Sequence, residues 1–101
     1  MVRKIIWSQR SQIDRKEIFD YWNNRNKSKA YSIKLRRLIK EASLKLADNP
    51  FLGSLVRNHS YIRKKVVGDY LIVYEFDDQK IVILSIFDTR QHPDKLNNNI
   101  K

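Results

Sequence analysis

The sequence predicts an α+β domain in which two N-terminal helices pack on a small antiparallel sheet, in the order β-α-α-β-β-β. Three observations predict it. An apolar period of 3.6 residues runs through 31–46, apolar runs separated by turn residues fill 62–88, and a short apolar run lies at 3–7. A short C-terminal helix is expected to begin at Pro93. The 101 residues suit a single domain, 1–101, with one core.

The N-terminal part is predicted to contain a short strand at residues 3–7 and a helix that runs to about Asn24. Ser8 or Ser11 can cap this helix, and Asp14 follows Ser11 at the spacing of a capping box. Apolar residues at positions i, i+3 and i+4 give the helix one buried face, formed by Ile18, Tyr21 and Trp22.

A second helix is predicted between the polar residues 23–28 and the sequence Asp-Asn-Pro at 48–50. Ser28 is its expected N-cap, and the proline ends it because proline disfavours a helical conformation in the preceding residue. Its buried face follows the 3.6-residue period and consists of Tyr31, Leu35, Leu38, Ile39, Ala42 and Leu46. Residues 50–61 have no sustained period and are expected to form a connecting loop.

The last third is predicted to form three strands, at residues 62–67, 70–76 and 80–88. Gly-Asp at 68–69 supplies the first turn, because this pair tolerates positive φ, and Asp-Asp at 77–78 supplies the second. Both faces are apolar in residues 71–74 and 81–84. This pattern indicates strands that are covered on both sides or lie centrally in the sheet.

The composition is strongly basic. Lysine and arginine total 21 against 11 acidic residues, which gives a formal charge of +10 and a pI near 10.0. Such an excess favours nucleic acid, an anionic surface or an acidic protein as partner. The absence of cysteine excludes disulfides, thiolate metal sites and a cysteine nucleophile, and two glycines cannot build a P-loop or a dinucleotide fingerprint. No metal or small-molecule cofactor is expected. The N-terminal apolar run is too short for a signal sequence or a membrane span, so we expect a cytoplasmic protein.

Cations gather at both ends of the predicted strand region. Arg63 and Lys65 share one strand face by the period of two, and Lys64 lies on the other. With Arg90 they could form a phosphate-binding or target-binding patch if the strands bring them together. An edge strand whose lysines prevent aggregation is an equal alternative. His92 could transfer a proton in RNA cleavage while Arg90 holds the phosphate, or it is a surface histidine.

A histidine, one side of the second helix and a set of aromatic residues are each expected to be solvated or to pack in the core, with a functional role as the alternative. His59 lies in the predicted loop and is expected to be solvated. The basic side of the second helix is expected to be a solvated face; it consists of Lys34, Arg37 and Lys45. Six aromatic residues fall in apolar periodic runs and are expected to pack in the core: Trp7, Tyr21, Trp22, Tyr70, Tyr74 and Phe76.

Four segments carry a family resemblance: IFDYW (18–22), LADNPFLG (46–53), IRKKVVGDYLIVYEF (62–76) and IVILSIFDTRQHP (81–93). Together, and in this order, they resemble the RelE/ParE superfamily of toxins from bacterial type II toxin–antitoxin modules, which includes plasmid stabilisation toxins. The resemblance covers nearly the whole chain. It implies the same α+β fold and a cognate antitoxin, with an acidic or partly disordered segment that folds as it wraps the toxin.

The resemblance implies one of two activities. RelE-like members cleave messenger RNA on the ribosome with a basic constellation on the sheet, whereas ParE-like members lack it and poison DNA gyrase. Arg90 corresponds to a phosphate-binding arginine of the ribonuclease branch, and Lys64 or Lys65 to its basic second-strand positions. Leu71 and Leu96 stand where that branch has an arginine and a tyrosine. Leucine cannot neutralise a developing phosphorane, and losing one such contact typically costs about two to three orders of magnitude in rate.

These departures favour a ParE-like toxin that arrests growth by binding DNA gyrase without chemistry of its own. The alternative is a RelE-like, ribosome-dependent endoribonuclease, with Arg90 and His92 as catalytic residues and Arg63, Lys64 and Lys65 as phosphate ligands. A second alternative, which rests on charge alone, is a non-toxic basic module that binds nucleic acid. The sequence leaves open whether the chain is an enzyme.

Overall fold

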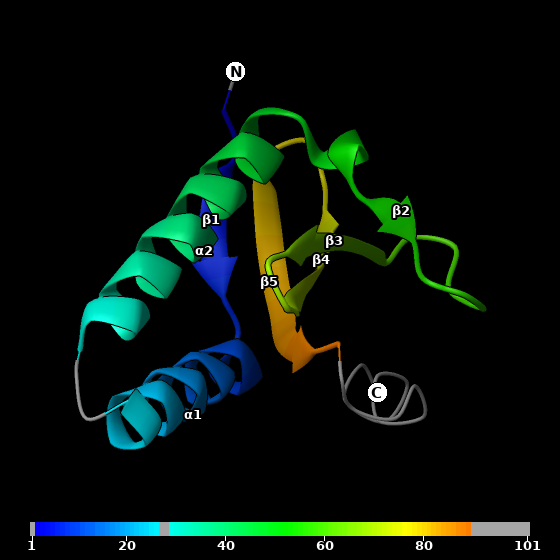
Figure 1. Ribbon diagram of the computed structural model, residues 1–101. Helices are drawn as coiled ribbons and strands as arrows, with labels where there is room; N and C mark the ends of the chain where they lie inside the picture. The colour runs from blue at the N-terminus through cyan, green and yellow to red at the C-terminus, as the bar shows by residue number, and fades with distance from the viewer. Residues whose placement is uncertain (1, 27–28, 90–101) are drawn as a thin grey trace.

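Two helices lie against one face of a five-stranded sheet (Figure 1). The computed structural model describes residues 2–26 and 29–89. The elements follow the chain as β1 (Lys4–Trp7), α1 (Gln9–Asn26), α2 (Ala30–Asp48), a 3-10 helix η1 (Pro50–Leu52), β2 (Ser54–Leu55), β3 (Arg63–Val67), β4 (Tyr70–Phe76) and β5 (Lys80–Asp88). The predicted α+β fold is confirmed, and the predicted C-terminal helix lies outside the described residues.

The strands are ordered β1-β5-β4-β3-β2, so β5 lies inside the sheet although it is the last of them in the chain. The pairs from β2 to β5 are antiparallel, whereas β1 runs parallel to β5. The sheet is therefore mixed, and not purely antiparallel as predicted. A parallel neighbour needs a long crossover connection, which the helical hairpin and β2–β4 provide here.

Residues 50–61, predicted as a loop, contain η1 and the edge strand β2, so this prediction is wrong in part. β2 pairs with β3 through Ser54 opposite Lys64 and Leu55 opposite Arg63. A strand of two residues has no periodic signal, which is why the sequence does not reveal it. The other strand boundaries agree with the prediction within one residue, and Gly68 adopts the predicted positive φ, at 61°.

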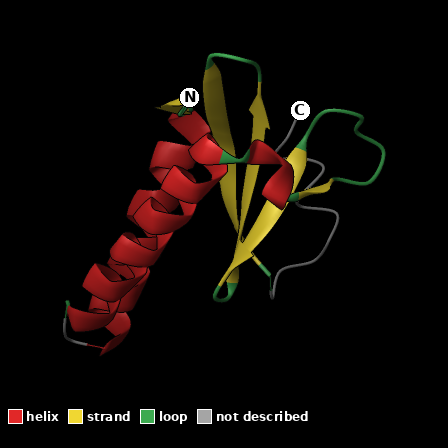
Figure 2. Ribbon diagram, turned by 90° about the horizontal axis from the view of Figure 1, so that it is seen from above, coloured by secondary structure: helices red, strands yellow, loops and turns green. Residues whose placement is uncertain are grey.

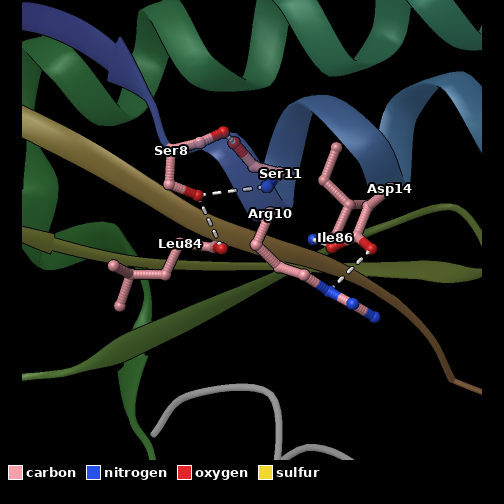
Figure 3. Close-up of polar contacts among 6 residues, drawn as sticks. All are labelled: Ser8, Arg10, Ser11, Asp14, Leu84 and Ile86. Atoms are coloured by element: carbon pink, nitrogen blue, oxygen red, sulfur yellow. Dashed lines mark hydrogen bonds and ion pairs between the residues drawn. The ribbon is translucent and has the colours of Figure 1, made fainter.

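The N-terminus of α1 is joined to β5 by side chains. Ser8 Oγ accepts a hydrogen bond from the Ser11 N–H at 3.0 Å and donates to the Leu84 carbonyl at 2.9 Å (Figure 3). Ser8 is therefore the cap, and the alternative cap at Ser11 with a capping box to Asp14 is wrong. Asp14 Oδ2 instead accepts from the Ile86 N–H of β5 at 3.1 Å. Ser8 and Asp14 thus supply the hydrogen bonds of β5 beyond the point where β1 ends.

The buried face of α1 differs from the predicted one at one position. Phe19 is buried, and Ile18 and Trp22 pack against the core as predicted, but Tyr21 is 47% exposed. The buried stripe continues toward the N-terminus of the helix through Asp14, which is itself buried. Because Asp14 is a polar residue, a search for periodic apolar residues does not detect this part of the buried stripe.

α2 buries the face that its period predicts, with Leu35, Ile39 and Leu46 at most 2% exposed. Its N-cap residue is Lys29, which makes no side-chain capping bond, and the predicted cap Ser28 lies outside the described residues. The helix ends before Pro50 as predicted.

The sheet is covered on both faces in its centre. Figure 2 shows both helices on one side of the sheet. On that side Ile72, Tyr74, Ile81 and Ile83 are buried against the helices. On the other side the chain before β3 returns over the sheet, where Val56 and Ile62 pack on Val73 and Leu84. This agrees with the prediction from the apolar runs in β4 and β5. Neither α1 nor α2, as far as the structure describes them, has an apolar stretch that could cross a bilayer.

Candidate functional site

The three predicted cations of β3 are divided between the two faces of the sheet. Arg63 lies opposite Tyr74 and Lys65 opposite Ile72, both on the helix side, whereas Lys64 lies opposite Val73. This division agrees with the strand period. Arg90 and His92, the other predicted site residues, lie outside the described residues, as does Leu96. Their proximity to β3 stays a prediction.

Arg63 is held by the segment that contains η1 and β2. Its Nη1 donates a hydrogen bond to the Gly53 carbonyl at 2.7 Å, and its guanidinium carbon lies 5.1 Å from the centre of the Phe51 ring. A cation over an aromatic face is attracted by the ring quadrupole. The side chain is half-buried in this position. One of its donors and one face of its guanidinium plane are therefore already used within the protein.

Tyr74 also holds the segment that contains η1 and β2. Its hydroxyl donates to the Pro50 carbonyl at 2.6 Å and accepts from the Gly53 N–H at 2.9 Å, and the residue is fully buried. Burial raises the pKa of this hydroxyl, while the Gly53 N–H and the Arg63 charge offset part of the effect. Gly53 has no room for a side chain, since a Cβ would collide with the Tyr74 hydroxyl and lie 2.6 Å from the Lys64 carbonyl.

The anchored segment presents apolar side chains to solvent. Phe51, Leu52 and Leu55 are 65%, 49% and 48% exposed, and we call these three residues the apolar edge. Phe51 also contacts Phe76 edge to face, with ring centres 5.2 Å apart. Exposed apolar side chains that neighbour one another often mark a protein-binding surface. The sequence did not indicate this role, because the tyrosine that anchors the segment stands in an otherwise ordinary apolar strand.

Leu71 lies in an apolar environment. It is opposite Val66 in β3 and Phe87 in β5, on the side of the sheet away from the helices. The position that carries an arginine in the RelE-like branch is thus half-buried among apolar neighbours. Its neighbour Val66 is 60% exposed, so this part of the surface is apolar and reaches solvent.

Of the residues predicted to be solvated, those of α2 are exposed, whereas His59 is only partly exposed. Lys34, Arg37 and Lys45 are exposed on α2, and Arg37 Nε lies 4.0 Å from Glu41 Oε1 in the next turn. His59 is half-buried in the turn after β2, where its backbone N–H donates to the Val56 carbonyl at 3.0 Å. Residues 2–26 and 29–89 hold no group of three or more His, Asp or Glu side chains that could bind a metal ion.

Comparison with known proteins connects this geometry to a family. The sequence profile of the family described as "ParE toxin of type II toxin-antitoxin system, parDE" matches residues 5–93. The chain belongs to this ParE toxin family. It is a toxin of a type II toxin–antitoxin system, and the resemblance to the RelE/ParE superfamily is confirmed. A search of curated proteins found no match.

The ParE fold is also seen in a solved structure, described as "Chromosomal ParDE TA system from P. aeruginosa". The superposition has a TM-score of 0.73 at 15% sequence identity, and it covers 88% of this chain and 98% of that chain. At such low identity the match establishes the shared fold alone. The residues of this ParE toxin that bind a partner are therefore inferred from its own surface.

Proposed function

We propose that this ParE toxin arrests bacterial growth by binding DNA gyrase in the cytoplasm, without catalysing a reaction. A cognate antitoxin with an acidic or partly disordered segment neutralises it. Membership of the ParE family supports this target over the ribosome. Such growth arrest fits a role in plasmid stabilisation. The apolar edge, held in place by Tyr74 and Arg63, is a suitable surface for a protein target.

The observation that carries the proposal is how the cationic and apolar side chains of β3 and β4 are arranged. A ribonuclease needs several free cations that converge on one phosphate. Here Arg63 is engaged with Gly53 and Phe51, Lys64 is on the opposite face, and Leu71 is apolar among apolar neighbours. On the helix side of β3 Lys65 is exposed, and Arg63, the other cation on that face, is already engaged within the protein. Such a surface supports binding more readily than phosphoryl chemistry.

The charge of the chain supports an acidic antitoxin. At +10 the toxin attracts an acidic segment over distances up to the Debye length, about 8 Å at physiological ionic strength. The association should therefore be fast and should weaken with added salt.

Two measurements on one culture and one assay with the purified protein test the proposal. After pulsed expression, growth is recorded and the 5′ ends of cellular RNA are mapped; the purified protein is then added to a gyrase supercoiling assay. We expect growth arrest without new RNA ends, together with inhibited supercoiling. Supercoiling that is unaffected by excess protein would refute the gyrase target. New ends inside translated codons would establish the RelE-like alternative and make Arg90 and His92 the first residues to replace. Absence of arrest, with salt-dependent binding of DNA or RNA, would favour the non-toxic module.

A further inference from the structure

Two arginines from different helices come together beside the edge strand β1. The guanidinium carbon of Arg15, in α1, lies 4.1 Å from the centre of the Trp7 ring, and that of Arg36, in α2, lies 4.7 Å from the centre of the Phe19 ring. Both side chains line a groove of about 330 Å³ between β1, α1 and α2. We call it the arginine groove. A second depression of about 270 Å³ along α1 adjoins it at Arg15, Phe19 and Arg36.

The two arginines lack an acidic partner. Among the residues that the structure describes, ion pairs join Arg10 to Asp14, Lys16 to Asp20, Arg37 to Glu41 and Lys80 to Asp77, and none involves Arg15 or Arg36. The Asp20 carboxylate, which also lines the second depression, lies 3.3 Å from Lys16 Nζ. Carboxylates are thus present on both helices but are directed to other cations.

Placing two unpaired cations together has an unfavourable electrostatic energy. Burial, and after it the Arg36 charge, lowers the pKa of the half-buried Arg15 guanidinium. Lys40, which also lines the groove, adds a third positive charge to it. Bound carboxylates would remove this repulsion and would form charge-assisted hydrogen bonds with the guanidinium donors.

The remainder of the groove is apolar. Its walls include Ile5, Trp7, Phe19, Ile39 and Leu44, and Leu44 is 49% exposed. A polynucleotide backbone would place its phosphates beside the arginines but could not use these apolar walls. A peptide can use both, because an apolar side chain fills the groove while neighbouring carboxylates reach the arginines.

We infer that the arginine groove binds an acidic segment of the antitoxin, with one apolar side chain in the groove and carboxylates on Arg15 and Arg36. The inference rests on the proposed neutralisation by an acidic antitoxin. β1 and β2 are the two outer strands of the sheet, separated by β5, β4 and β3. The groove beside β1 would then be three strands away from Leu55, the residue of the apolar edge that lies in β2.

Calorimetric titration with the purified product of the adjacent small open reading frame tests the inference. The double variant Arg15→Gln/Arg36→Gln is compared with Arg37→Gln/Arg57→Gln, which removes the same charge from exposed positions outside the groove. We expect each groove arginine to contribute about tenfold in affinity or more, since tenfold equals about 1.4 kcal/mol and a hydrogen bond to a charged group contributes at least that much. The double groove variant should therefore bind about 100-fold more weakly, and the control within about threefold of wild type.

A second pair of variants tests the apolar part of the groove without altering the arginines. Leu44→Ser makes the groove wall polar without adding a charge, and Ile33→Ser makes a matching change at a 63% exposed position of α2 that does not line the groove. Leu44→Ser should weaken antitoxin binding by about tenfold, and Ile33→Ser should leave it close to wild type. Thermal denaturation of each variant establishes that it is folded.

The outcomes separate the two proposals. If the wild-type toxin fails to bind this product, the proposed antitoxin is refuted, and the inference falls with it. If the wild type binds tightly and the folded groove variants bind equally tightly, only the inference is refuted. Loss of binding to a 20-nucleotide RNA or DNA duplex in the arginine variant, with antitoxin binding retained, would also overturn it and would assign the groove to nucleic acid.

Discussion

Replacing Tyr74 with phenylalanine removes one buried oxygen atom and two hydrogen bonds. The hydroxyl donates to the Pro50 carbonyl and accepts from the Gly53 N–H, and all three residues are buried. Leaving a buried polar group without a partner costs about 1–3 kcal/mol. The Pro50 carbonyl and the Gly53 N–H would both lose their partner, and small movements would recover part of the cost. The free energy of unfolding should therefore fall by about 2–4 kcal/mol. In a domain of this size that lowers Tm by about 10 °C or more.

Urea denaturation followed by circular dichroism measures the effect, and Tyr61→Phe is the matched control. Tyr61 is 65% exposed, so the same loss of a hydroxyl should change the free energy of unfolding by less than about 0.5 kcal/mol. A Tyr74→Phe variant as stable as the Tyr61→Phe variant would refute the idea that the Tyr74 hydroxyl anchors η1 and β2. Gly53→Ala adds a second test. It should be strongly destabilising in the wild type and less so when combined with Tyr74→Phe, because one of its two collisions is then removed.

Four further predictions concern the turns and the contact of α1 with β5. Asp14→Ala should lower the free energy of unfolding by about 1–3 kcal/mol, because the buried Ile86 N–H loses its acceptor. Burial raises the pKa of Asp14. The stability that this raised pKa contributes is therefore largest at acidic pH and is lost as pH rises through the folded-state pKa. The stability of Asp14→Asn relative to wild type should improve between pH 4 and pH 7. Hydrogen bonds from the Gln79 and Lys80 N–H groups lower the pKa of Asp77 to about 2, so Asp77→Ala should destabilise the protein at neutral pH, and the difference should vanish as pH falls toward that value. Gly68→Ala should cost about 1 kcal/mol, because the residue has a φ of 61°. Denaturation midpoints test all four variants, those at Asp14 and Asp77 across pH, and a pH-independent difference between wild type and Asp77→Ala would contradict the prediction for Asp77.

The strands β4 and β5 could be predicted to the residue because local signals agree there. The apolar run of β4 begins after the turn at Gly68 and ends at Asp77. Gly68 adopts the positive φ that its turn requires, and the Asp77 carboxylate accepts hydrogen bonds from the Gln79 and Lys80 N–H groups. The parallel pairing of β1 with β5 has no such signal. It pairs Lys4 with Lys80, which are far apart in the sequence, and it depends on how the helices pack.

The candidate surfaces were predictable only in part. The division of Arg63 and Lys65 from Lys64 follows from strand alternation alone. The engagement of Arg63 by the Gly53 carbonyl depends on where η1 lies, and a sequence pattern does not contain that position. Arg15 and Arg36 were missed because each looks like one more surface cation on a helix. A signal was present, since Arg15 falls on the buried stripe of α1, four residues before the buried Phe19.

The position of β5 inside the sheet has a consequence for the synthesis of the toxin. β1 pairs with no other strand, and the first turn of α1 is fixed to β5 through Leu84 and Ile86. The first 26 residues therefore cannot complete their contacts until residues 80–88 have left the ribosome. Contacts between such distant parts of a chain also form slowly, because the loop-closure entropy must be overcome first. We expect a newly made toxin molecule to remain incompletely folded until β5 has been synthesised, which would give an antitoxin already in the cell time to meet it before it can act.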